Sequence, residues 1–214
     1  ELAANPDATT GHWRTLALYR FALDDLLAAT NAIETAIKAN EASVAAWKTA
    51  ADLFEHAGRL SDAGNALRRL ADLDRRFRGE HLLKIVSLER QLGQIQGALE
   101  AGKLLLATAP GNPDHLQTYA DLCFEAGSIE EGLNTLRRAV RVNSSDEKSL
   151  LALAQALTDR NEFEEAIELY WKAFAKSREL DSKLDLTVRL VALHKQKKTM
   201  ATLIENFQQR RKCN

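Results

Sequence analysis

The chain has 214 residues, of which 45% are hydrophobic and 28% charged, and its formal net charge is −1. This balance is ordinary for a soluble globular protein, and it argues against a general nucleic-acid binder, which usually carries a basic excess. No apolar run approaches the 18 residues of a membrane span, and the first residues, Glu-Leu-Ala-Ala, show no signal pattern and no Met. We therefore expect a fragment or a processed form of a longer protein.

The two cysteines do not make a disulfide framework. Cys123 falls on an apolar stripe and is expected to be a small buried thiol, whereas Cys213 stands in a polar tail and is expected to be exposed. Such low cysteine use slightly favours the cytoplasm, and the periplasm or a secreted state stays open if a signal peptide has been removed.

The chain repeats itself about every 34 residues, in windows near 10–43, 44–78, 79–112, 113–146, 147–180 and 181–214. The fourth place of each window is large and apolar: Trp13, Trp47, Leu82, Leu116, Leu150 and Leu184. The eighth place is small or β-branched: Ala17, Ala51, Val86, Ala120, Ala154 and Val188. The twentieth place of the first five windows is small: Ala29, Ala63, Ala98, Gly132 and Ala166. A period of this length is typical of a solenoid of paired helices, in which the small residues let the two helices of a pair approach closely.

Within each window, apolar spacing predicts two helices joined by a turn. Residues 44–57 and 113–126 carry apolar side chains at i, i+3, i+4 and i+7, and Pro113 suits a first helical turn. Residues 163–174 show the same kind of stripe for a second helix. The turn is expected at the fifteenth place, where Gly58, Gly93, Gly127 and Asn161 tolerate a left-handed backbone. Ser145 or Asp146 is expected to cap the helix that follows.

Motifs that would indicate catalysis or a cofactor are missing from the sequence. It has no Walker loop, Rossmann glycine pattern, His-Glu-x-x-His or paired-cysteine metal motif. His12, His81 and His115 share the third place of their windows, but stacked helix pairs lie about 10 Å apart, too far for shared metal bonds. We expect them to be exposed first-turn residues. His56 lies near two acids without any nucleophile, so no catalytic, cofactor or metal site is predicted.

Arginine pairs recur late in the second helices, at Arg68-Arg69 and Arg137-Arg138. They could form a phosphate-binding stripe. The favoured interpretation is structural, because acids come early in the same helices and bases late, which complements the helix dipole. No nucleic-acid partner is therefore expected.

These residues resemble the tetratricopeptide repeat family. The second window matches it at Trp47, Ala51, Phe54, Gly58, Ala63 and Leu67, and the fifth at Leu150, Ala154, Leu157, Asn161, Ala166, Tyr170 and Ala173. The departures are Asp24 at the first turn, Arg20, Glu89 and Gly102 at apolar places, and Met200 with a Lys-rich turn in the sixth window. The resemblance implies an all-α fold, a right-handed superhelix (solenoid) of about twelve antiparallel helices in stacked hairpins, over residues 1–214 as a single domain.

The resemblance also implies that the first helices line a concave groove. Its expected residues are Arg14, Leu18, Phe21, Lys48, Asp52, Glu55, His56, Leu83, Ser87, Arg90, Gln91, Gln117, Asp121, Phe124, Glu125, Leu151, Gln155, Thr158, Asp159, Asp185 and Arg189. Phe21 and Phe124 are the expected anchors, because aromatic side chains dominate interface energies. The basic pair with which some relatives clamp a terminal carboxylate is incomplete here, since Leu83 and Ser87 follow Lys48 and Asp52.

The predicted function is a non-catalytic protein–protein interaction scaffold that holds a peptide segment or a partner helix in this groove. The alternative is the substrate-recruiting arm of a larger enzyme, such as a glycosyltransferase, or of an export or secretion assembly. Self-association through the exposed ends of the solenoid is a third possibility.

Overall fold

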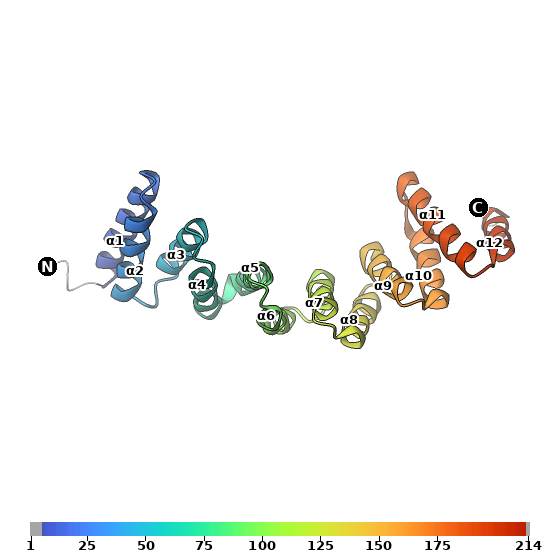
Figure 1. Cartoon of the computed structure of the whole chain (residues 1–214), viewed down its shortest axis with the longest axis horizontal. Coiled ribbons are helices and arrows are strands. Elements are labelled where there is room, and N and C mark those ends of the chain that lie inside the picture. Colours follow the sequence, from blue (N-terminus) through green and yellow to red (C-terminus); the bar gives the residue numbers. More distant parts are fainter. Residues whose placement is uncertain (1–5, 213–214) are drawn as a thin grey trace. The chain divides into compact units, whose positions relative to one another are not determined.

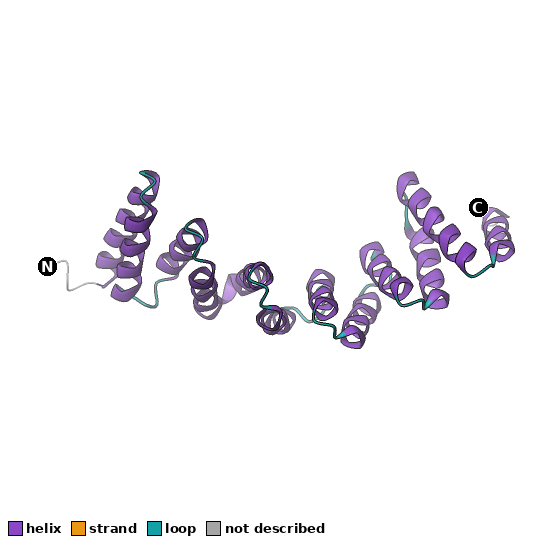
Figure 2. Cartoon of the chain, in the orientation of Figure 1, coloured by secondary structure: helices purple, strands orange, loops and turns teal. Residues whose placement is uncertain are grey.

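The computed structural model describes residues 6–212, and every regular element in this range is helical (Figure 2). The helices are α1 (Pro6–Ala22), α2 (Leu26–Ala39), α3 (Val44–His56), α4 (Leu60–Leu73), η2 (Arg75–Phe77, a short 3-10 helix), α5 (Arg78–Gln91), α6 (Ile95–Thr108), α7 (Pro113–Glu125), α8 (Ile129–Val142), α9 (Glu147–Asp159), α10 (Phe163–Lys176), α11 (Leu180–Gln196) and α12 (Met200–Lys212).

The chain divides into two compact units, one ending at Ala109 and the other beginning at Pro110. The first unit contains the pairs α1–α2, α3–α4 and α5–α6, and the second contains α7–α8, α9–α10 and α11–α12 (Figure 1). Within each unit, the second helix of a pair also packs on the first helix of the next pair. The predicted fold class, all-α with stacked helix pairs, is confirmed.

The turn inside each pair has the same backbone conformation in all six pairs of the described chain. Gly58, Gly93 and Gly127 adopt φ values of 70°, 70° and 75°, as predicted from their place in the window. The three pairs without glycine place Asp24, Asn161 and Lys198 in the same left-handed region, at 60°, 62° and 58°. The residue after each turn donates its N–H back into the helix, as Arg59 does to the Phe54 carbonyl at 2.8 Å. The turn geometry is therefore kept even where the side chain disfavours it.

Polar side chains begin several helices. The side chains of Ser43 and Asn112 accept hydrogen bonds from the first turns of α3 and α7, and Pro113 is the first residue of α7, as expected. Of the two candidates before α9, Asp146 is the cap: it accepts the Ser149 N–H at 2.9 Å.

The small residues at the eighth and twentieth places of the first five windows are buried, as predicted for close packing within a pair. Ala17, Ala29, Ala120 and Ala154 are fully inaccessible. Cys123 is a buried free thiol, which confirms that expectation, whereas Cys213 lies outside the described residues.

The packing register expected for the sixth window is wrong. Leu184 and Val188 are 64% and 60% exposed, and Leu186, Leu190 and Leu193 are buried in their place. The reason is the length of α11, which has 17 residues and ends before a turn centred on Lys198, three places later than the period predicts. A shift of three residues turns a helix by about 300°, so a different stripe faces the core.

Glu89, which departs from the apolar pattern, is buried in α5 with 3% of its surface exposed. Its carboxylate pairs with Arg68 of α4. A Cβ on Gly97 of α6 would lie only 2.9 Å from the Glu89 Cδ, so the missing side chain of Gly97 makes room for this acid. Three helices thus cooperate to bury this acid and to neutralise it.

The recurring arginine pairs also serve the fold. Arg137 of α8 forms an ion pair of 2.9 Å with Glu165 of α10, and Arg138 donates to the Pro110 carbonyl at 2.6 Å. Together with the Arg68–Glu89 pair, these contacts support the structural interpretation of the arginine pairs rather than a phosphate-binding stripe.

Candidate peptide-binding surface

Two successive first helices in the first unit enclose a small hollow between them, here called the α1–α3 hollow. Its volume is about 280 Å³. Four of its lining residues are predicted groove residues; the full lining consists of Leu18 and Phe21 from α1 and Thr49, Asp52, Leu53 and His56 from α3. In the structure, four residues that were predicted to line the groove therefore lie around one hollow.

The α1–α3 hollow has an apolar wall and a polar rim. Phe21 is partly buried, and its ring meets the edge of the His56 ring with centroids 5.2 Å apart. His56 donates its Nδ1–H to the Asp52 carbonyl at 2.7 Å, which fixes the imidazole over the phenyl ring. Leu18 keeps 45% of its surface exposed. An apolar side chain of a partner can contact Leu18 and Phe21 while its backbone reaches Asp52 and His56.

A second hollow of about 500 Å³, the α3–α5 hollow, lies next along the same unit and also contains Asp52. Lys48 of α3 and Glu80 and Lys84 of α5 line it as well. The Lys84 ammonium lies 3.8 Å from the Asp52 carboxylate, and both side chains are more than half exposed. Asp52 thus joins the two hollows into one surface of mixed charge.

In the second unit, the predicted groove residues Gln155 and Arg189 lie in contact. Arg189 donates to the Gln155 side-chain oxygen at 2.9 Å and to Asp185 at 2.7 Å. The hydrogen bond to the Asp185 carboxylate raises the pKa of the Arg189 guanidinium above its usual value. Gln155 in turn donates to Asp159 at 2.9 Å. This polar cluster presents charges of both signs to solvent.

Other predicted groove residues are engaged in the fold or lie elsewhere. The Phe124 ring is partly buried and packs over Gly132, where an added Cβ would lie 2.8 Å from its Cδ1 atom, so Phe124 helps to hold α7 on α8. The Thr158 hydroxyl donates to the Ala154 carbonyl at 2.8 Å. Gln117 is partly buried and Asp121 exposed on α7. Glu55, Ser87 and Arg90 are exposed, but they line neither the α1–α3 nor the α3–α5 hollow.

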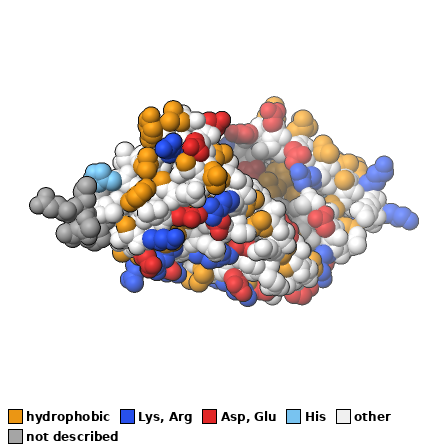
Figure 3. Space-filling view, turned by 60° about the vertical axis from the view of Figure 1, so that its left-hand side comes forward, with side chains coloured by type: hydrophobic (Ala, Val, Ile, Leu, Met, Phe, Trp, Pro, Cys, Tyr) orange, Lys and Arg blue, Asp and Glu red, His pale blue; other side chains and the backbone are white. Residues whose placement is uncertain are grey.

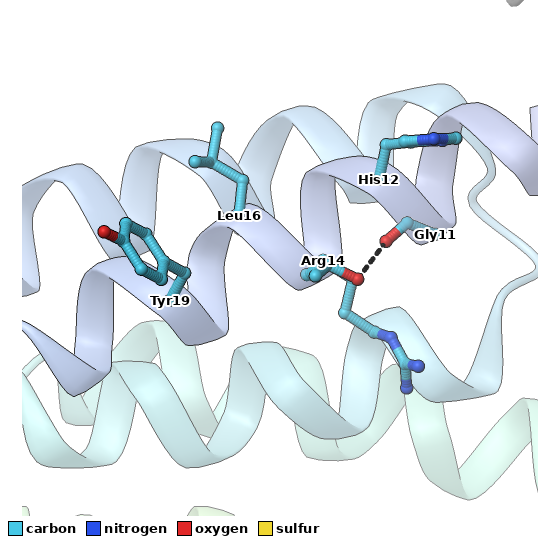
Figure 4. Close-up of a pocket in the computed structure, with 6 residues that line it drawn as sticks. Gly11, His12, Arg14, Leu16 and Tyr19 are labelled. Atoms are coloured by element: carbon cyan, nitrogen blue, oxygen red, sulfur yellow. Dashed lines mark hydrogen bonds between the residues drawn. The ribbon is translucent and has the colours of Figure 1, made fainter.

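Arg14 does not line the α1–α3 hollow, although it lies four and seven residues before Leu18 and Phe21 on the same face of α1. It borders an open hollow with Gly11, His12, Leu16 and Tyr19, and it points away from Leu16 and Tyr19 (Figure 4). The hydrogen bond drawn there joins Thr15 to the Gly11 carbonyl at 2.9 Å and stays within the helix.

The outer face of α1 consists of three large side chains, Trp13, Leu16 and Tyr19, which are 37%, 36% and 59% exposed. They hold the fourth, seventh and tenth places of the first window. In the third window the same places are Leu82, Ile85 and Leu88, and these are no more than 3% exposed because α5 packs on α4. No helix precedes α1 in the described residues, so this face meets solvent. Figure 3 shows hydrophobic side chains gathered beside the N-terminal residues.

Comparisons with known proteins agree with this architecture. Residues 14–78 match the family described as "Tetratricopeptide repeat", and residues 91–173 match "Anaphase-promoting complex, cyclosome, subunit 3". The two matches fall on the stacked helix pairs described above. Residues 14–78 match the tetratricopeptide repeat family, and the described chain has that family's fold of stacked helix pairs.

Several solved structures share the fold at low sequence identity. They include a repeat protein from Parabacteroides merdae (15% identity, TM-score 0.59, covering 94% of this chain and 78% of that one). Another is YrrB, described as a TPR protein with an unusual peptide-binding site (12% identity, TM-score 0.55, covering 81% and 89%). A third is the MamA protein (17% identity, TM-score 0.58, covering 78% and 91%).

A curated relative, the transcription factor tau 131 kDa subunit of Saccharomyces cerevisiae, is 26% identical over 155 residues, which are 72% of this chain. The chain spans only 15% of the length of that relative. Tetratricopeptide repeat proteins are typically non-catalytic scaffolds for protein–protein interaction.

The histidines differ from the expectation of three exposed first-turn residues. His12 is exposed, but His81 is largely buried 3.4 Å from the Asp74 carboxylate, and His115 buries its Nδ1. Within residues 6–212, no group of three or more His, Cys, Asp or Glu side chains is placed to hold a metal ion. In the same range, no helix is long and apolar enough to cross a membrane.

Proposed function

We propose that the chain binds an extended peptide segment or a partner helix along the exposed faces of its first helices. The observation that carries this proposal is the α1–α3 hollow, where Leu18, Phe21, Asp52 and His56 meet. A concave apolar spot with a few convergent polar groups is the usual form of a recognition site.

Binding would combine one apolar anchor with several polar contacts. A partner's apolar side chain enters the α1–α3 hollow and covers Leu18 and Phe21, and charged side chains next to it along the partner face Lys48, Asp52 and Lys84 in the α3–α5 hollow. Because these charges are exposed, each contributes little alone, and they chiefly select the partner. The Phe21 ring is expected to supply the largest single contribution to affinity.

The first experiment captures partners by photo-crosslinking. A photoreactive amino acid replaces Leu18, which lines the hollow, and in a matched control it replaces Leu27 of α2, which is 74% exposed and does not line it. We expect a crosslinked protein at position 18 and none of the same identity at position 27. Equal crosslinking at both positions would contradict the site.

The second experiment measures affinity for the captured partner. Phe21→Ala is expected to weaken binding by about tenfold or more, the ordinary loss for an aromatic anchor. Tyr19→Ala is the matched control, because Tyr19 is an exposed aromatic residue of the same helix that lies outside the hollow. An unchanged dissociation constant for Phe21→Ala in calorimetry would refute the anchor.

Self-association is a second candidate, favoured by the outer face of α1. Trp13, Leu16 and Tyr19 are exposed to solvent. The residues at the equivalent positions of the third window are buried under a neighbouring helix. A helix pair from a second copy could pack on this face as α4 packs on α5. Light scattering across a dilution series tests it: Leu16→Glu should abolish any concentration-dependent increase in mass, and a mass that stays monomeric at every concentration in the unmodified protein rules the candidate out.

A role as the substrate-recruiting arm of a larger enzyme, or of an export or secretion assembly, stays a prediction. It requires further domains in the parent reading frame, and that reading frame is the direct test.

A further inference from the structure

Three arginines that follow one another closely in sequence line a single hollow in the first unit. Arg75 and Arg76 belong to η2, and Arg78 is the first residue of α5. The hollow has a volume of about 730 Å³, and its opposite wall is the end of α6, with Leu104, Ala107 and Thr108. We call it the arginine hollow. It shares no lining residue with the α1–α3 or α3–α5 hollow.

The positive charges of the arginine hollow are not balanced by acids of the described chain. No ion pair or hydrogen bond to an acid is found for Arg75, Arg76 or Arg78 within residues 6–212. The acids that are nearest in sequence, Asp74 and Glu80, line the α3–α5 hollow instead, and Asp74 pairs there with His81. This differs from Arg59, Arg137, Arg160 and Arg189, each of which has an acidic partner.

Two details show that the side chains of Arg76 and Arg78 make contacts with the protein rather than extending freely into solvent. The Arg76 guanidinium lies over the Phe77 ring, 5.2 Å from its centroid. The Nε of Arg78 is buried and has no hydrogen-bond partner. A buried charged donor without an acceptor is costly, and a negative charge bound at the exposed end of the same guanidinium would lower that cost.

We propose that the arginine hollow binds a phosphorylated side chain of a partner protein. Guanidinium groups recognise phosphate through paired hydrogen bonds, and a phosphate carries close to two negative charges and three strong acceptor oxygens for three arginines. The hydroxyl of Thr108 already donates to the Leu105 carbonyl at 2.6 Å, so the arginines supply the donors. Leu104, 48% exposed, and Ala107 offer an apolar surface for the carbon atoms next to the phosphate.

The size and the surroundings of the site favour a protein segment over a nucleic acid. A nucleic-acid surface follows several phosphates with many cations, and single-strand binders add aromatic platforms for the bases. Here three cations line one hollow, the Arg76 guanidinium already lies over the adjacent Phe77 ring, and the whole chain has a net charge of −1. This proposal does not depend on the peptide groove, because the two surfaces have no lining residue in common.

The test is a nuclear magnetic resonance titration of the whole chain with N-acetyl-O-phosphoserine-N-methylamide. The unphosphorylated serine compound and the corresponding glutamate compound are titrated in parallel. We expect saturable shifts of the Arg75, Arg76 and Arg78 side-chain N–H signals with the phosphorylated probe, and at least about tenfold weaker binding of the glutamate probe. Raising the ionic strength should weaken binding.

Variants assign the effect to the hollow. Arg75→Gln and Arg76→Gln should each weaken phosphoserine binding by about tenfold, whereas Arg141→Gln, an exposed arginine of α8, should leave it unchanged. Arg78→Lys keeps the charge and removes the paired donors of the guanidinium, so it should weaken binding as well. The spectra outside residues 75–108 report whether each variant is folded.

Several results would overturn the proposal. One is the absence of saturable shifts at the three arginines up to about 10 mM probe, since weaker binding carries no biological selectivity. Equal affinity for the glutamate probe would remove the phosphate assignment. Tighter binding of a ten-residue oligothymidine to the same arginines would assign the hollow to nucleic acid instead.

Discussion

Replacing Arg68 by Ala should destabilise the first unit by about 2 kcal/mol. The change leaves the Glu89 carboxylate, only 3% exposed, without its cation. Breaking a fully buried ion pair costs about 3–5 kcal/mol. The Arg68 side chain is 49% exposed, so solvent screens part of the attraction. We therefore expect a loss below that range, about 2 kcal/mol. Glu89→Leu removes the buried charge and restores the apolar residue expected there, so its stability should change by less than about 1 kcal/mol.

The decisive comparison is the double variant. In the Glu89→Leu background, Arg68→Ala should have almost no effect, because the charge that Arg68 neutralises is gone. Urea unfolding followed by tryptophan fluorescence measures all four proteins, since Trp13 and Trp47 report on the first unit and Trp171 on the second. With a slope of about 2 kcal/mol per molar urea, the single variant should lower the midpoint of the first unit by about 1 M. A loss of the same size in both backgrounds would refute the buried-pair reasoning.

Three further predictions concern packing, turns and surface charge. Gly132→Ala should destabilise the second unit by about 1–3 kcal/mol in urea unfolding, because its Cβ would overlap the Phe124 ring, and combining it with Phe124→Ala should remove the overlap. Lys198→Gly should stabilise that unit by about 1 kcal/mol in the same assay, since Lys198 holds a φ of 58°; a loss of stability would contradict a strained turn. The hydrogen bond from Lys197 lowers the pKa of the Glu164 carboxyl, so their pair stabilises the fold above the ordinary pKa of 4.5 and this contribution is lost as the pH falls below it. Lys197→Ala should move the Glu164 pKa upward in a carboxyl titration by nuclear magnetic resonance, and an unchanged value would show that the pair does not form in solution.

The fold could be predicted where the sequence keeps its 34-residue period. Gly58 and Ala63 show why: a turn that needs a left-handed backbone and a helix contact that needs a small side chain each restrict the residue type locally. The prediction was wrong at Leu184, because α11 is three residues longer than the period predicts. A different stripe of the helix, which is also apolar, therefore faces the core. Hydrophobic spacing alone fits both registers, and only the position of the Lys198 turn decides between them.

The candidate site could be predicted only in part. Leu18, Phe21, Asp52 and His56 meet because neighbouring first helices place equivalent positions side by side. Phe124 fails as a freely available anchor because Gly132, on the next helix, leaves room for its ring to pack inward.

The arginine hollow was missed. Its far wall, at Leu104 of α6, is remote in sequence from Arg75, and whether an arginine has an acidic partner depends on such long-range packing. A signal was nevertheless present, since Arg75-Arg76-Phe77-Arg78 is a basic run in a connection where the other windows have none.

The Glu89 contact also fixes the order in which the helix pairs are joined. The apolar residues of one pair resemble those of the next, so hydrophobic packing alone would allow the pairs to be joined in several different orders. The buried acid of α5 requires Arg68 on the preceding helix and a residue without a side chain, Gly97, on the following one. A protein with its repeats shuffled would leave Glu89 unneutralised or in collision with a neighbour. Glu89 thus specifies which helices can pack on either side of α5. A chimera that transplants α5 must therefore carry both neighbouring helices with it.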